Sequence, residues 1–145
     1  MRTGQLFSLL IVALALMSPG ELSAAELTVE VLGARSNDGF MHFGLYDNPE
    51  TFPTKDGRMG GAQAAISDNR AVTVFRGLTP GRYALAVFHD ENGNGEFDQV
   101  FFGLPMEGFG FSNGAVAFFG PPGFDDAMVS VPPEGAMITI RINKP

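Results

Sequence analysis

The sequence predicts an all-β fold, an antiparallel β-sandwich of about seven strands. Apolar and polar residues alternate in several short runs, which is the period of a half-buried strand. Clusters of Gly, Pro, Asn and Asp separate these runs at intervals of about 8–12 residues, as in sandwiches. No window of a dozen residues carries the periodicity of an amphipathic helix.

The expected strands follow one another along the chain. In the first, Leu27, Val29 and Val31 alternate with polar residues. Pro80 and Gly81 predict a tight turn between two later strands. The segment 57–68 is the nearest candidate for a short helical turn, although its glycines weaken that prediction. The expected strands cover residues 26–36, 39–47, 71–78, 81–90, 126–131 and 136–142.

Residues 1–25 have the pattern of a secretory signal peptide. Arg2 supplies the positive region, Leu6 to Met17 the apolar region, and Ser23-Ala24-Ala25 the small residues of a cleavage site. The apolar stretch of about 12 residues is short for a membrane anchor, which takes roughly 20. We therefore expect an exported protein, periplasmic or extracellular. It would have a single domain over residues 26–145 and no membrane span once the signal is removed.

Composition excludes some functions and favours others. The formal net charge is −7, which argues against a nucleic-acid partner because phosphates need a Lys/Arg surface. An acidic chain suits solubility and the binding of cations. The sequence has no Cys, so disulfides play no part in its stability, and export without them fits a bacterial periplasm or exterior.

The most informative segment is "HDENGNGEFD", His89 to Asp98, directly after an apolar run. Oxygen-bearing side chains recur at every second residue, and a glycine stands at the sixth position, where a calcium loop turns sharply. We expect Glu96 to offer its backbone carbonyl. The candidate ligands for Ca²⁺ are Asp90, Asn92, Asn94, Glu96 and Asp98.

The loop departs from a helix-flanked calcium loop at the twelfth position. Phe101 stands where a bidentate Glu is needed, so a remote carboxylate would have to complete the site. The candidates for that role are Glu107, Asp125 and Asp126. The alternative interpretation is a solvated hairpin tip, because two successive Asn-Gly pairs are also a strong hairpin signal. No cofactor other than Ca²⁺ is expected.

Other motifs favour catalysis less. "GFSNG" around Ser112 matches a G-x-S-x-G elbow, but both histidines, His42 and His89, precede it and nothing nearby is α/β. Nothing in the sequence brings the two histidines together as metal ligands. The alternative function is a small hydrolase that uses carboxylates of the same acidic region. Paired carboxylates such as Asp125-Asp126 could also carry out glycosidase chemistry, but a small sandwich without Trp offers little wall for a sugar.

The Gly- and Phe-rich stretch 101–124 predicts long loops fixed by aromatic side chains. We expect its phenylalanines to fold onto the end of the sheet as a second small core. The other hypothesis is an exposed apolar patch that binds a partner or lipid. The phenylalanines concerned are 101, 102, 109, 111, 118, 119 and 124.

Nearly all of the chain after residue 26 resembles a known family. The runs "LTVEVLGARSNDGFMHFGLYDNPETFP", "GLTPGRYALAVFHDENGNGEFD", "FGLPMEGFGFSNGA" and "GPPGFDDAMVSV" carry the resemblance. It is to the bacterial secreted family catalogued as domain of unknown function 2141. The "GLTPGRYAL" turn is also similar to that of prealbumin-like sandwiches. The resemblance implies a secreted Ig-like or prealbumin-like sandwich and carries no catalytic residues across.

From these features we expect an exported, non-enzymatic domain. Ca²⁺ would stabilise the loop at 89–98, and the Gly/Phe-rich loops would bind a protein or another component of the cell envelope.

Overall fold

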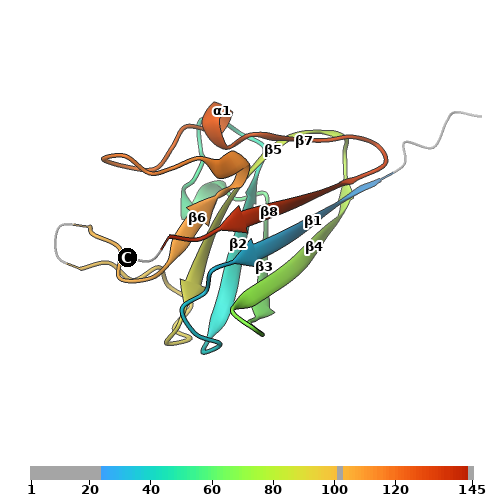
Figure 1. The fold of residues 1–145 in the computed structure, drawn as a ribbon. Helices are drawn as coiled ribbons and strands as arrows, with labels where there is room; N and C mark the ends of the chain where they lie inside the picture. The colour runs from blue at the N-terminus through green and yellow to red at the C-terminus, as the bar shows by residue number, and fades with distance from the viewer. Residues whose placement is uncertain (1–23, 101–102, 144–145) are drawn as a thin grey trace, which may run out of the picture.

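Two packed β-sheets make up the part of the chain that the computed structural model describes, residues 24–100 and 103–143 (Figure 1). The strands are β1 (Ala25–Leu32), β2 (Phe40–Tyr46), β3 (Gly60–Ala65), β4 (Arg70–Leu78), β5 (Gly81–Asp90), β6 (Phe109–Phe111), β7 (Val129–Val131) and β8 (Ala136–Arg141). Three one-turn helices complete the fold: η1 (Lys55–Gly57), η2 (Ser112–Gly114) and α1 (Phe124–Ala127). The all-β sandwich is confirmed, with eight described strands where about seven were expected.

The two sheets differ in size and in strand direction. The smaller has the order β4-β1-β8, and the larger has the order β3-β2-β5-β6, with β7 also paired to β5. All pairs are antiparallel except β1 with β8, which run parallel, so the expectation of a purely antiparallel sandwich was wrong at this pair. The turn at Gly135 packs against the backbone of Glu26, so β8 starts at the same end as β1. Alternation within a strand carries no signal of its direction, because both kinds of ladder have period two.

The alternating apolar residues of the strands form the main core. Leu27, Val29 and Val31 are fully buried, as their period-two spacing predicts. The facing sheet contributes Met41, Phe43, Leu45, Leu85 and Val87 to the same cluster. Truncating such a side chain, for example Phe43→Ala, removes about 3–5 kcal/mol of folding free energy.

Two segments differ from their predicted conformation. Residues 60–65, inside the candidate helical turn, form β3 along the edge of β2, where Gly61 pairs with Gly44. Gly44 of β2 allows the Arg58 side chain to approach closely at this pairing, since a Cβ on Gly44 would lie 2.9 Å from it. The strand expected over 126–131 is only Val129–Val131, because α1 takes up its first residues. Asp125 and Asp126 in the first turn favour that helix.

A second small core lies at the end of the larger sheet. Phe111 and Phe124 pack with Tyr46, Phe52 and Ala84, and the Phe52 ring makes edge contacts with both phenylalanines at 6.1 Å. Phe109 packs against this cluster, so the expected second core is confirmed for three of the phenylalanines. It was wrong for Phe118 and Phe119, which are 82% and 99% exposed. Phe101 and Phe102 lie outside the described residues.

No helix in the described part of the chain is long and apolar enough to span a bilayer. Residues 1–23, which hold most of the expected signal peptide, lie outside the described residues.

Candidate functional site

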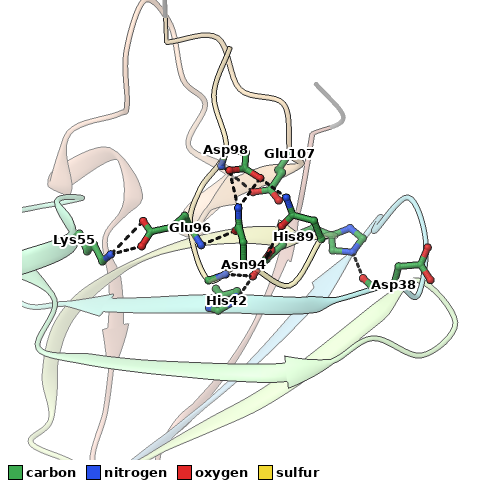
Figure 2. A network of polar contacts seen from close by, with 11 residues as sticks. Asp38, His42, Lys55, His89, Asn94, Glu96, Asp98 and Glu107 are labelled. Atoms are coloured by element: carbon green, nitrogen blue, oxygen red, sulfur yellow. Dashed lines mark hydrogen bonds and ion pairs between the residues drawn. The ribbon is translucent and has the colours of Figure 1, made fainter. Parts of the chain in front are cut away.

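The acidic loop begins where β5 ends. Asp90 is the last residue of β5 and pairs with Phe40 on β2, so its position is fixed by two central strands of the larger sheet. Residues 91–98 then leave the sheet and fold back over this end of it (Figure 2). Residues 103–108 lead into β6, which pairs with β5 on the side opposite β2.

Asp90 is a buried carboxylate that organises the loop. It is 1% exposed, and its oxygens accept hydrogen bonds from Gly95 N at 2.8 Å, Asn94 N at 3.1 Å and His42 Nε2 at 3.0 Å. Burial alone would raise the pKa of Asp90, but the hydrogen bonds from Gly95, His42 and Asn94 outweigh it, so its pKa lies below the ordinary value. Asp90 is therefore ionised, and its carboxylate fixes the loop by binding the backbone N–H groups of Asn94 and Gly95.

Two asparagines and Asp98 converge on the outer side of the loop. The Nδ2 of Asn92 donates to Asp98 at 2.7 Å, and the Nδ2 of Asn94 donates to both oxygens of Asp98 at 3.0 and 3.1 Å. The amide oxygens of Asn92 and Asn94 accept from the N–H groups two residues later, at 3.1 and 2.9 Å. These Asx turns wind the loop so that alternate side chains share one side.

Glu107 joins this group from the segment before β6. Its carboxylate is 6% exposed and accepts hydrogen bonds from the backbone N–H of Asp98 at 3.1 Å and from that of Glu91. Burial raises the pKa of Glu107, and the neighbouring carboxylates of Asp98 and Asp90 raise it further, while those two hydrogen bonds oppose the shift. Figure 2 shows Glu107 and Asp98 next to each other above Asn94. The fold thus brings three carboxylates into one electrostatic neighbourhood.

Glu96 is expected to offer its backbone carbonyl, and its side chain points away from the loop and pairs with Lys55 at 2.9 Å. The other two candidate carboxylates lie elsewhere. Asp125 and Asp126 are exposed on α1, next to β7, which pairs with the start of β5 rather than with its end at Asp90. Within 24–100 and 103–143, no three His, Cys, Asp or Glu side chains are placed to hold a metal ion. A cation at the loop would therefore need amide and backbone oxygens as well.

The two histidines lie on opposite faces of the larger sheet. His42 and Phe88 are cross-strand partners, and their rings stack 4.8 Å apart beside Asp90. His89 points to the other face, is fully buried, and places Nε2 2.7 Å from the carbonyl of Asp38. Its Nδ1 has no described hydrogen-bond partner and lies 3.6 Å from Glu91 Oε1, and both residues line a cavity of about 10 Å³, room for one water molecule. They cannot share a metal ion, since one faces out and the other in.

The sequence did not predict the contact between His42 and Asp90, although the alternation of β2 and β5 contains the signal. Given the register, Phe40, His42, Phe88 and Asp90 must share a face, but register is not readable from one strand.

Ser112 is structural. It is fully buried, and its Oγ accepts from Leu85 N at 2.8 Å and donates to the carbonyl of Ala127 at 2.5 Å. These bonds tie η2 to β5 and α1. A catalytic serine needs a free hydroxyl beside a base, and here both hydroxyl functions are used by the backbone.

Comparison with protein families places the chain. The model of a family described as an uncharacterized protein conserved in bacteria, DUF2141, matches residues 29–139. The chain belongs to this family. The matched span contains the acidic loop, Glu107 and Ser112 of this DUF2141 protein. The family description names no activity. Searches of curated proteins and of solved structures gave no significant match to this chain.

Proposed function

We propose that this DUF2141 protein is an exported, non-enzymatic β-sandwich module whose acidic loop binds Ca²⁺, with a structural role for the ion. The ion would be held by Asp98 and by the side-chain oxygens of Asn92 and Asn94. Glu107 would complete the site, and Asp90 would position the loop without coordinating the ion.

The observation that carries the proposal is the convergence of Asn92 and Asn94 on Asp98. Both amides lie within 2.7–3.1 Å of this carboxylate through their nitrogens. A half-turn of each amide exchanges its nitrogen for its oxygen and directs three oxygen-bearing side chains at one centre. The half-turn gives up the two bonds that the amide oxygens accept from the loop backbone and the three that the amide nitrogens donate to Asp98. A divalent cation offsets this loss, because Ca²⁺ takes six to eight oxygens in flexible geometry.

The charges near Asp98 support the same proposal. Asp90, Asp98 and Glu107 are acidic and attract a cation. Without a cation, Glu107 is held in a buried position beside two other carboxylates. The only basic group that contacts one of these three among the described residues is His42, at Asp90. A bound cation neutralises crowded carboxylates and fixes the loop that holds them.

Two further features support an exported binding module. The positive, apolar and small-residue pattern of residues 1–25 is that of a signal peptide. Ser112, the one match to a nucleophile motif, is occupied by backbone hydrogen bonds. The Gly/Phe-rich loops would then present the module to its partner in the cell envelope.

The test is thermal unfolding of the exported chain in EDTA, in Ca²⁺ and in Mg²⁺. Ca²⁺ at a hundredfold excess over its dissociation constant should stabilise the fold by about 2.7 kcal/mol, and Mg²⁺ should stabilise it much less. Asp98→Asn should abolish the calcium effect. Asp125→Asn, an exposed carboxylate on α1, should retain it.

Identical melting curves in EDTA and Ca²⁺ would contradict the calcium site. A hydrolytic activity lost in Asp98→Asn, without any calcium effect on unfolding, would support the carboxylate-dependent hydrolase instead.

A further inference from the structure

A loop without charge projects from the sandwich between η2 and α1. It covers residues 115–123, and Figure 1 shows it extending well away from both sheets before it returns to α1. Val116, Phe118 and Phe119 are exposed along it, the last two almost completely. Large apolar side chains at this exposure are uncommon on a soluble domain and mark an interaction site when they are contiguous.

The base of this loop is anchored to the rest of the fold. Ser112 is buried just before the loop, and Asn113 donates through Nδ2 to the carbonyl of Asp126 at 3.0 Å. Phe124, at the other end, is buried in the second core. The loop therefore leaves and re-enters the domain at fixed points, and its tip is presented outward.

The tip itself has a defined arrangement. The Phe118 and Phe119 rings make an edge contact with centroids 4.7 Å apart. Phe118 N donates to the carbonyl of Gly120 at 3.0 Å, and Phe119 adopts a left-handed backbone with φ of 54°. A bulky residue is seldom found in that region because its Cβ crowds the backbone. The turn thus places both rings in water at a conformational cost.

The chemistry of the loop fits lipid better than protein. From Gly114 to Phe124 no side chain is charged or carries a hydrogen-bonding group. Protein interfaces combine their apolar anchors with a polar rim and about one hydrogen bond per 100–200 Å². A segment that enters a lipid interface needs apolar side chains and few free backbone donors, because lipid offers such donors no partner. Pro121 and Pro122 remove two such donors at the tip, and Phe118 N is already bonded.

We propose that Phe118 and Phe119 insert into the interfacial region of a lipid bilayer and hold the domain against the membrane surface. This names the envelope partner of the proposed function; it rests on the export of the chain and is independent of the calcium site. Asp125 and Asp126, exposed directly after the loop, set the depth of insertion because carboxylates stay in water. The net charge of −7 means that insertion, rather than attraction to anionic headgroups, provides the binding.

The chain lends itself to a direct test because it contains no Trp. The substitution Phe119→Trp places a single indole fluorophore at the tip of the loop. Met137→Trp, on the exposed face of β8, places the same fluorophore on an apolar site outside the loop and is the matched control. Each variant of the exported chain is mixed, in EDTA, with phosphatidylcholine vesicles and with vesicles that also contain phosphatidylglycerol.

With phosphatidylcholine vesicles, the indole emission of the Phe119→Trp variant should shift to shorter wavelength and be quenched by lipids brominated on the acyl chain. The emission of the Met137→Trp control should not change. Adding phosphatidylglycerol should weaken binding. In a sedimentation assay Phe118→Ser with Phe119→Ser should lower vesicle binding on the order of a hundredfold, whereas Met137→Ser should leave it unchanged.

Three results would overturn the proposal. The first is indole emission from the Phe119→Trp variant that does not respond to either kind of vesicle. The second is a wavelength shift that depends on protein concentration without lipid, which assigns the tip to a second copy of the chain. The third is equal vesicle binding by the serine double variant and the unchanged chain. Since both serine substitutions are at exposed positions, circular dichroism of that variant should show an intact fold.

Discussion

Replacing Asp90 by Ala should destabilise the domain more than any other single change in the acidic loop. The substitution leaves Gly95 N, Asn94 N and His42 Nε2 without their acceptor at the buried end of β5. A hydrogen bond to a charged group contributes about 1.5–3 kcal/mol, but bonds to one carboxylate are not additive. A donor left unsatisfied in a buried position costs about 1–3 kcal/mol, so for three donors with non-additive effects we expect Asp90→Ala to cost about 3–5 kcal/mol.

The assay is urea unfolding in EDTA at neutral pH, with thermal unfolding alongside it. For a domain of this size the expected loss lowers the melting temperature by about 10–20 °C. The pH dependence gives an independent readout. Because the pKa of Asp90 is lowered in the fold, its contribution is present above its unfolded pKa of about 4 and is lost as the pH falls through the folded value. The variant should therefore lose less stability than the unchanged chain on acidification.

The matched control is Asp125→Asn, which removes an exposed carboxylate from α1 and should change the free energy of unfolding by less than about 0.5 kcal/mol. If Asp90→Ala also changes it by less than about 1 kcal/mol, the claim that Asp90 fixes the loop is refuted. If the variant and the unchanged chain lose the same free energy of unfolding as the pH is lowered, the assignment of the lowered pKa to Asp90 is contradicted.

Three further changes test other parts of the account. Glu107→Gln should stabilise the calcium-free fold at neutral pH, because ionising a carboxylate whose pKa is raised by folding destabilises the fold. Unfolding measured across pH 3–8 should show this gain vanish below the unfolded pKa of about 4. The stabilisation by calcium should also be lost. Gly39→Ala should cost more than about 2 kcal/mol in urea unfolding, since a Cβ there lies 1.8 Å from the carbonyl of Asp90, whereas Gly77→Ala, with open space around it, should cost clearly less. Ser112→Ala should cost about 1–3 kcal/mol by leaving Leu85 N unsatisfied, and an effect no larger than that of the exposed Ser130→Ala would contradict its structural role.

Sequence patterns were sufficient for the sandwich because each main strand carries its own period-two signal. Leu27, Val29 and Val31 on β1 and Met41, Phe43 and Leu45 on β2 alternate inward as expected. The parallel pairing of β1 with β8 was not predictable, because it depends on the path between two strands that are far apart in the chain. The exposure of Phe118 and Phe119 was also missed, since burial depends on whether another element covers the loop.

The candidate site was predictable only where its parts are local. The Asx turns at Asn92 and Asn94 follow from residue type and spacing. The arrival of Glu107 at Asp98, and the separation of Asp125 and Asp126 from the loop, depend on how β6 and α1 pack. The carboxylate of Asp90, a candidate ligand by spacing, is turned toward His42 and the loop backbone, and that orientation depends on the pairing of β2 with β5.

The central claim is that Asn92, Asn94, Asp98 and Glu107 surround a calcium ion. Crystallising the exported chain in calcium chloride tests it most directly, with anomalous scattering to identify the metal. The account predicts an ion at the loop with both asparagine amides rotated so that their oxygens lie about 2.3–2.6 Å from it. Asparagine nitrogens still bonded to Asp98, with no ion between them at saturating calcium, would contradict the account and leave the loop as a self-closed hairpin tip.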